Sequence, residues 1–482
     1  MKKINLILLL VLVGIGLSCT KNFEDYNTDK KRPVSVPAQF LFANAQKAFV
    51  DQTASTNVNL NNWKLFSQYW TETTYTDEAN YDVVNRNCGT LLFRTYYRDI
   101  LADVNDARKI ITAEVVAGDA ATAEKQNRLY ILDIFESMVY QDLVDAFGDV
   151  PYTEALDIEN IHPVYDDAYT IYKSLIERTQ AAVNGLNDGY GSFGDDDLYL
   201  AGDVSMWKKL GNTLLVKLAI NVSNVDMGYA QPIIEGAYAG AFAAGEHASY
   251  AYPGGSYANP LYQDLIQSGR HDFVPANTIV DMMNGLTDPR RSVYFTPIED
   301  GSYLGGLYGE SNPFAQFSHI ADPIQEPTYP MVLADYTELA FYLAEAAEKG
   351  MSVGGSAAAW YENGIRSSFD TWGVSADADA YLAQSNVAYA TAAGNWAQKI
   401  GTQAYLAYYV RGFVGWTSWR RLGFPALNLP PSPAESANGN VPRRHTYAIA
   451  EQTLNGDNYT AAASAIGGDE LSTPLFWDTV GK

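Results

Sequence analysis

The sequence contains little cysteine and histidine, and both shortages limit the kinds of site that it can form. Only Cys19 and Cys88 occur among 482 residues, which excludes a disulfide-stapled scaffold and a cysteine-ligated zinc site. None of the five histidines lies in an H-E-x-x-H or H-x-H arrangement. The run Asp195-Asp196-Asp197 lacks the spacing of an EF-hand and predicts a solvated acidic turn rather than a calcium site. We therefore expect no metal and no cofactor.

The short motifs of common enzymes are also missing. The sequence has no P-loop, and its one G-x-S-x-G match, at 350–354, directly follows a predicted helix, whereas a nucleophile elbow follows a strand. We therefore expect a protein that is not an enzyme. One enzymatic alternative stays open, a surface glycosidase, because the two carboxylates of such an enzyme can lie far apart along the chain.

The sequence lacks an apolar run of the length that a membrane-spanning helix needs, about 20 residues. The apolar run over residues 4–17 follows two lysines and is typical of a secretory signal. Small residues lead from it to Cys19, the arrangement of a bacterial lipoprotein. We expect residues 1–18 to be a removed signal peptide, Cys19 to be lipidated, 19–37 to be a tether and 38–482 to be the folded domain. The alternative is an ordinary secreted protein in which Cys19 has no such role.

Positive charge is scarce as well. Acidic residues outnumber basic ones by 56 to 32, and the formal net charge is −24. Such a chain repels nucleic acid and anionic lipid headgroups, so we expect no nucleic-acid partner. Attachment to a membrane must then come from the lipid on Cys19, and not from a basic patch.

Helical periodicity dominates what the sequence does contain. Apolar residues recur at three- and four-residue steps over 123–147, and strand-like alternation is scarce. Further helices are predicted over 38–52, 91–116, 165–186, 205–224, 277–285, 334–349, 356–372 and 396–410. The loops between them are long and rich in Gly, Pro and Tyr, over 187–203, 247–275, 294–330 and 423–447. Loops of this length are usually functional or disordered, and their aromatic content argues against disorder.

Aromatic residues are the positive chemical signal. The chain has 34 Tyr, 19 Phe and nine Trp, and Tyr and Trp combine a flat apolar face with a polar tip. That combination suits ligands with C–H faces and hydroxyls or amides, such as sugars and peptides.

Two segments concentrate these residues. In 62–86 we select Trp70, Tyr75, Tyr81 and Arg86 as candidate ligand-binding residues, and for the three aromatic ones core packing is an equally good interpretation. Trp63 and Tyr69, on the predicted helical part, are assigned to the core. The Gly-rich segment 300–314 adds Tyr303 and Tyr308, with a plain surface loop as the alternative.

Several segments resemble one family. The segment YQDLVDAFGDVPYTEAL at 140–156 resembles part of the SusD/RagB-type proteins, nutrient-binding outer-membrane lipoproteins of Bacteroidetes. Six more segments resemble the family in the same order, at 197–219, 286–295 (LTDPRRSVYF), 334–350, 400–425 (with WRRLGFP), 441–462 and 467–478. Counted together with Cys19, they run from residue 19 to residue 478, which is nearly the whole chain.

The resemblance implies a fold and a role. The fold would be mainly α, a single large helical unit with tetratricopeptide-like helix pairs and long aromatic-rich loops. The protein would bind an oligosaccharide or, as in RagB-type relatives, a peptide at the cell surface. It would deliver this nutrient to a SusC-like TonB-dependent transporter barrel. A purely structural role without a ligand is the remaining alternative. The paired arginines Arg420, Arg421, Arg443 and Arg444 are expected to tie the C-terminal loops and not to contact nutrient.

Overall fold

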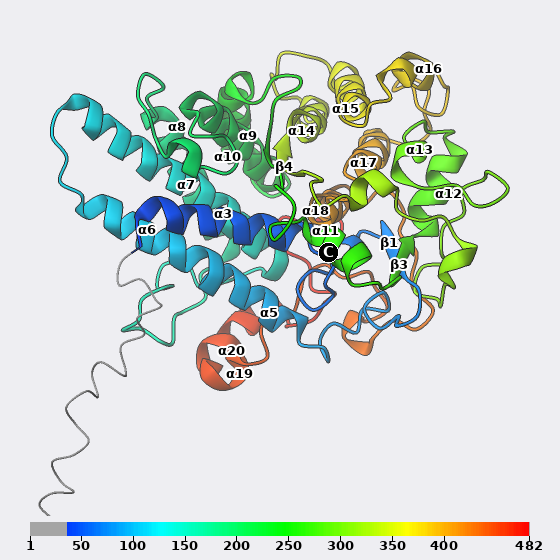
Figure 1. Cartoon of the computed structure of the whole chain (residues 1–482), viewed down its shortest axis with the longest axis horizontal. Coiled ribbons are helices and arrows are strands. Elements are labelled where there is room, and N and C mark those ends of the chain that lie inside the picture. Colours follow the sequence, from blue (N-terminus) through cyan, green and yellow to red (C-terminus); the bar gives the residue numbers. More distant parts are fainter. Residues whose placement is uncertain (1–35, 482) are drawn as a thin grey trace, which may run out of the picture. The chain divides into compact units, whose positions relative to one another are not determined.

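Helices joined by long loops make up the structure, a computed structural model that describes residues 36–481 (Figure 1). The longer helices are α3 (Ala38–Ala54), α6 (Ala102–Ala113), α7 (Asp119–Phe147), α8 (Ala168–Gly185), α9 (Val204–Val222), α10 (Met227–Ala237), α14 (Tyr336–Glu348), α15 (Ala357–Thr371), α17 (Trp396–Ala407), α18 (Gly412–Leu422) and α20 (Gly456–Ala465). The shorter ones are α4 (Trp63–Phe66), α5 (Cys88–Arg94), α11 (Pro260–Tyr262), α12 (Asn277–Gly285), α13 (Arg291–Tyr294), α16 (Ala378–Leu382) and α19 (Glu451–Leu454). The mainly α prediction is confirmed.

Local signals set several helix ends. Asp203 precedes α9 and accepts hydrogen bonds from the backbone N–H groups of Ser205 and Met206, which lack partners inside the helix. Asp335 caps α14 in the same way, through the backbone N–H of Glu338. Gly148 directly follows the last residue of α7, and its φ of +88° lies in the region that residues other than glycine avoid.

Consecutive helices pack as pairs. Helix α7 packs against α8, α8 against α9, and α9 against α10. A second series joins α14 to α15 and to α17, and α17 to α18. The pairs are visible side by side in Figure 1. This arrangement agrees with the predicted helix pairs.

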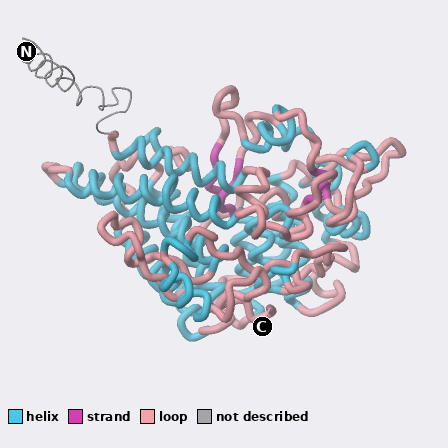
Figure 2. The backbone as a smooth tube through the Cα atoms, turned by 90° about the horizontal axis from the view of Figure 1, so that it is seen from below, coloured by secondary structure: helices cyan, strands magenta, loops and turns pink. Residues whose placement is uncertain are grey.

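Strands are few and short. β1 (Trp70–Glu72) pairs antiparallel with β3 (Phe273–Pro275), with Thr71 opposite Val274. β2 (His247–Tyr250) pairs antiparallel with β4 (Met331–Asp335). Figure 2 shows both ladders among loops. They join loops that lie far apart in the sequence and thereby position the site described below.

Aromatic side chains occupy much of the core. Trp63 stacks on Trp416 of α18 with ring centroids 5.0 Å apart, and Tyr69 lies against Tyr405 with centroids 4.7 Å apart. Trp63 and Tyr69 are both buried, as predicted.

The paired arginines tie the C-terminal loops, which confirms the expectation for them. Arg443 forms an ion pair with Asp478, and Arg444 forms one with Asp469. Arg420 lies 3.4 Å from the ring centroid of Trp416 and donates to the backbone carbonyl of Asp145. Arg421 pairs with Glu345 of α14 at 2.8 Å, so all four arginines have structural roles.

One expectation about charge is wrong. Asp197, predicted to lie in a solvated turn, is buried and accepts hydrogen bonds from the side chains of Gln46 and Trp207. Asp197 also accepts a hydrogen bond from the backbone N–H of Gly202. The carboxylate therefore anchors the loop between α8 and α9 to α3, because a buried carboxylate needs such donors.

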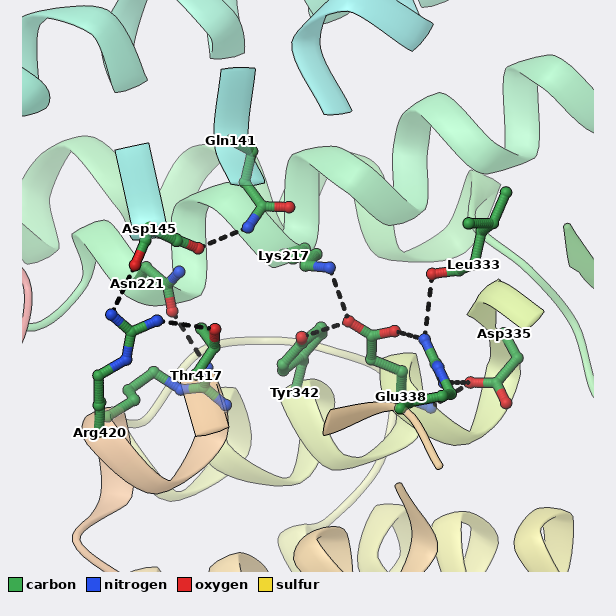
Figure 3. Close-up of polar contacts among 12 residues, drawn as sticks. Gln141, Asp145, Lys217, Asn221, Leu333, Asp335, Glu338, Tyr342, Thr417 and Arg420 are labelled. Carbon is green, nitrogen blue, oxygen red and sulfur yellow. Dashed lines mark hydrogen bonds and ion pairs between the residues drawn. The ribbon is translucent and has the colours of Figure 1, made fainter. Parts of the chain in front are cut away.

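A polar network lies inside the helical core (Figure 3). Glu338 on α14 pairs with Lys217 on α9 at 3.2 Å and with Arg411, and Tyr342 donates to it. Arg411 also pairs with Asp335 at 3.1 Å. Because buried charges are costly unless they are paired, this network constrains how α9, α14 and the start of α18 pack.

Candidate functional site

A polar cleft opens beside the β1–β3 ladder. Its volume is about 530 Å³. Its walls are Thr56, Asn57, Val58, Asn59, Glu72, Tyr75, Glu78, Arg86, Asp264, Ser268, Arg270, Asp272 and Phe273. Three separate segments thus supply the lining: the loop after α3, the stretch from β1 to Arg86, and the stretch before β3.

Hydrogen bonds fasten these segments to one another. The backbone N–H of Thr73 donates to the carbonyl of Asp272 at 2.9 Å, and its hydroxyl donates to the carbonyl of His271 at 2.6 Å. On the other wall, the backbone N–H and the hydroxyl of Thr56 both donate to Asp264 at 3.0 Å. The cleft is therefore held from both sides, although it consists of loops.

Two of the predicted ligand-binding residues line this cleft. Tyr75 is 65% exposed and presents an unburied aromatic ring. Arg86 pairs with Asp77 at 2.8 Å and with Glu78 at 3.0 Å, and these bonds fix its guanidinium. The structure thus brings an exposed ring and a fixed guanidinium to one cleft, and their role in ligand binding stays a prediction.

A carboxyl pair lies at the base of the cleft. Glu72 is only 4% exposed and accepts a hydrogen bond from the backbone N–H of Ala79 at 2.8 Å. Burial, and then the neighbouring charge of Glu78, raise the pKa of Glu72 to about 9. Burial also raises the pKa of Glu78, and Arg86 opposes that rise. The raised pKa means that Glu72 favours its neutral form, because burial and the charge of Glu78 both oppose its ionisation.

Three predicted ligand residues need a correction, because burial leaves them no surface for a ligand. Trp70 is 0% exposed and donates its indole N–H to the hydroxyl of Tyr409 at 3.0 Å. Tyr308 is buried and donates to the carbonyl of Leu65 at 2.8 Å. Tyr81 is also buried, with its ring 6.2 Å from that of Tyr308. These rings support the cleft from the core.

Tyr303 lies away from the cleft lining. It is half-buried, packs against the core, and has the guanidinium of Arg291 5.5 Å from its ring centroid. Its carbonyl accepts from the side chain of Asn284 at 2.9 Å. The predicted segment 300–314 therefore does not supply the ring that the sequence suggested.

The sequence reasoning missed the wall before β3. Asp264, Arg270 and Asp272 line the cleft, and Arg270 pairs with Asp272. A signal for them existed, since the run SGRHD places three ionisable groups inside the long loop 247–275. Only the pairing of β3 with β1 brings that run beside Tyr75.

Other predicted features lie outside the residues that the structure describes, or have no site among those residues. Cys19, the signal peptide 1–18 and most of the tether 19–37 lie outside the described residues. Within residues 36–481, no group of three or more His, Cys, Asp or Glu side chains is placed to hold a metal ion. None of the helices in the same part is long and apolar enough to cross a membrane.

Comparison with known families agrees with the helical fold. Residues 30–448 match the SusD-like family that is described as "Starch-binding associating with outer membrane". The chain belongs to the SusD-like family. This family is associated with the outer membrane, which fits the expected location. Comparison with curated proteins returns no match.

Solved structures resemble this SusD-like protein over most of its length. A chitin-binding protein is 25% identical with a TM-score of 0.80, over 92% of this chain and 100% of the other. A SusD-like protein from Bacteroides thetaiotaomicron is 25% identical with a TM-score of 0.76, over 92% and 99%. A chitin-binding SusD homologue from Flavobacterium johnsoniae has a TM-score of 0.76 at 22% identity, over 91% and 98%, which shows the shared fold.

Proposed function

We propose that this SusD-like protein binds an oligosaccharide at the cell surface through the cleft beside β1 and β3. The observation that carries the proposal is the exposed ring of Tyr75 on a cleft of about 530 Å³ whose other walls are mostly polar. A volume of this order accommodates a small ligand, for which typical sites have about 300–1,000 Å³. The family description and the chitin-binding protein of the same fold support a glycan as the ligand.

The residues of the cleft suit a sugar chemically. The face of Tyr75 can cover the C–H groups of a pyranose ring, which excludes water from that side. Arg86 and Arg270 are fixed by their carboxylate partners, so their remaining N–H groups can donate to sugar hydroxyls without much loss of side-chain entropy. Asp272 and Asn57 supply acceptors on the opposite walls.

The carboxyl pair favours binding over hydrolysis. Glycosidases separate their two carboxyl groups by about 5–10 Å, so that a sugar or a water molecule fits between them. Glu72 and Glu78 are instead buried, with exposed fractions of 4% and 1%, so neither carboxyl group is presented to a reacting sugar. We propose that the protein binds without catalysis.

The proposal has two further parts, a lipid anchor in the membrane and a transporter that receives the nutrient. A lipid on Cys19 would anchor the protein, and a SusC-like TonB-dependent transporter would receive the bound nutrient. Co-purification from gently solubilised outer membranes tests both parts. We expect a transporter in near-equal amount and an acylated Cys19 by mass spectrometry. Recovery of the protein alone would contradict the transporter role.

Replacing Tyr75 with alanine should weaken glycan binding. The loss of one exposed ring in direct contact is expected to raise Kd about tenfold, equivalent to about 1.4 kcal/mol. Isothermal titration with chitin, starch and peptide oligomers measures the effect and identifies the ligand class.

The matched control is Tyr190→Ala. Tyr190 is also exposed, follows α8, and does not line the cleft, so its removal should leave Kd unchanged. Equal affinity of the Tyr75→Ala variant and the unaltered protein would contradict this site. Saturable binding of peptides with no binding of glycans would assign the cleft to a peptide nutrient.

A further inference from the structure

The turn that carries Tyr75 is tied to β1 through one buried carboxyl group. This Tyr75 turn, residues 74–79, directly follows β1, and Tyr75 itself is exposed. In the part of the chain that the structure describes, a single hydrogen bond joins the turn to β1. The backbone N–H of Ala79 donates it to the carboxyl of Glu72 at 2.8 Å. The position of Tyr75 on the cleft therefore depends on Glu72.

The carboxyl groups of this segment outnumber its cations. Glu72 is 4% exposed, and Glu78, which directly precedes Ala79, is 1% exposed. The guanidinium of Arg86 pairs with Glu78 at 3.0 Å and with Asp77 at 2.8 Å. Three carboxyl groups thus have one guanidinium among them, and a buried carboxylate without a partner is costly. Burial, and then the charge of Glu78, raise the pKa of Glu72 to about 9, which agrees with this count.

The cations of the other elements around Glu72 are already engaged. Arg270, before β3, pairs with Asp272. Lys64, on α4, donates to the carbonyls of Ala54 and Ser55 at 2.9 and 3.0 Å. The ionisable groups of the elements packed around Glu72 are Lys64 on α4, Asp77, Glu78 and Arg86 after β1, Cys88 on α5, Asp264, Arg270 and Asp272 before β3, and Tyr308 after α13. Among residues 36–481, none of these cations forms an ion pair with Glu72.

We propose that the carboxyl of Glu72 is a pH-sensitive lock on the cleft, which holds the Tyr75 turn closed while it carries a proton. Ionisation of Glu72 places a second negative charge beside Glu78 in the buried base of the cleft, and opening of the turn hydrates both carboxylates. Glycan binding then weakens, because Tyr75 no longer lies in a fixed position. This effect on the ligand rests on the proposed function, whereas the movement of the turn does not.

The direction of the pH dependence follows from the two states of the turn. In the closed turn the pKa of Glu72 is about 9, above the ordinary value of 4.5, so the closed turn is fully stabilised below pH 4.5. As the pH rises from 4.5 to about 9, an open turn releases a proton that the closed turn keeps. The closing equilibrium therefore weakens by up to about tenfold per pH unit. The cleft should hold its ligand more tightly in acid than in alkali.

Lys64 gives the opposite wall a pH dependence of the opposite sign. Burial lowers the pKa of Lys64 to about 7, and the charge of Asp264 opposes that fall. The cost of burying the ammonium group is therefore relieved as the pH rises above about 7. A variant at Glu72 separates the two groups, because it removes only the dependence of the Tyr75 turn.

Hydrogen exchange followed by mass spectrometry tests the lock without a ligand. In the full-length protein, the protection of residues 74–79, corrected for the intrinsic dependence of exchange on pH, should fall between about pH 6 and 9. Glu72→Gln keeps an uncharged acceptor for the N–H of Ala79, so it should remove this fall. Glu78→Gln removes the neighbouring charge and lowers the pKa of Glu72, so the fall should be smaller and end at a lower pH.

Calorimetry with the hexasaccharides of chitin and of starch measures the effect on binding. For the unaltered protein, Kd should rise about tenfold between about pH 6 and 9, and for Glu72→Gln it should change less than about twofold. The control is Glu159→Gln. Glu159 is exposed and does not line the cleft, so this variant should follow the unaltered protein in both measurements.

The outcomes distinguish the lock from the function that it would regulate. The same pH profile of exchange in the unaltered protein and in Glu72→Gln would overturn the lock, whether or not a glycan binds. A profile that becomes flat in Glu72→Gln would support the lock, even where absence of glycan binding overturned the proposed function.

Discussion

Replacing Arg290 with alanine is expected to lower the free energy of unfolding by about 3–5 kcal/mol, the usual cost of breaking a buried ion pair. The guanidinium is 0% exposed and pairs with Asp288 at 2.6 Å. It also donates to the hydroxyl of Ser368 at 2.9 Å and lies 4.9 Å from the ring centroid of Phe369. Alanine would leave the carboxylate of Asp288 buried without its partner. Urea unfolding followed by circular dichroism measures the change.

The control for this prediction is a surface pair. Arg98 and Asp99 are 2.6 Å apart, but both side chains are solvent-exposed, so Arg98→Ala should cost less than about 1 kcal/mol. The double variant Arg290→Met with Asp288→Asn removes both charges and should be more stable than Arg290→Ala alone. A loss below about 1 kcal/mol in Arg290→Ala would show that this pair does not hold the fold.

Replacing Glu338 with glutamine should lower the free energy of unfolding by about 3 kcal/mol at neutral pH. Glutamine has nearly the same shape but leaves Lys217 and Arg411 buried with one negative partner fewer (Figure 3). Burial by itself raises the pKa of Glu338, but Lys217 and Arg411 outweigh it and the pKa falls to about 2. The same unfolding measurement, repeated across pH, tests the prediction.

The pH dependence has a definite sign. The folded pKa lies below the ordinary value of 4.5, so the ionised Glu338 stabilises the fold fully above that value. As the pH falls from 4.5 toward 2, the folded carboxylate takes up a proton and this stabilisation is lost. The difference between the unaltered protein and Glu338→Gln should therefore shrink in acid. Glu348→Gln, on an exposed position of the same helix, should show no such difference.

The buried charges in these two predictions lie in segments that resemble the family. Their location explains why the resemblance concerns the fold and not the ligand. The segment 286–295 contributes the buried pair of Asp288 and Arg290, and the segment 334–350 contributes Glu338. The arginines of 400–425 pack against Trp416 and pair with Glu345. Buried charges tolerate few replacements, because each needs its partner in place. The segments that carry the resemblance therefore specify packing, and the cleft consists largely of other residues.

Periodicity predicted most long helices and missed α10, α18 and α20, of which the first two have a physical cause in their composition. Neither α10 nor α18 was predicted, because α10 contains Pro232 and α18 contains two glycines. In α18 the glycines are needed, since a Cβ atom on Gly415 would lie 2.3 Å from the hydroxyl of Tyr69. Close packing against the aromatic core overrides the weak helix propensity of this segment.

The sequence by itself determined the helical class, the aromatic signal and the family. It could not separate Trp70 from Tyr75, which lie five positions apart in the same aromatic segment. Their exposures are 0% and 65%, because β1 pairs with β3 and turns Trp70 into the core, while the chain after β1 leaves it. Tertiary structure also brought Arg270 and Asp272 to the same cleft as Tyr75 from almost 200 positions away, since exposure and long-range neighbours depend on how the whole chain packs.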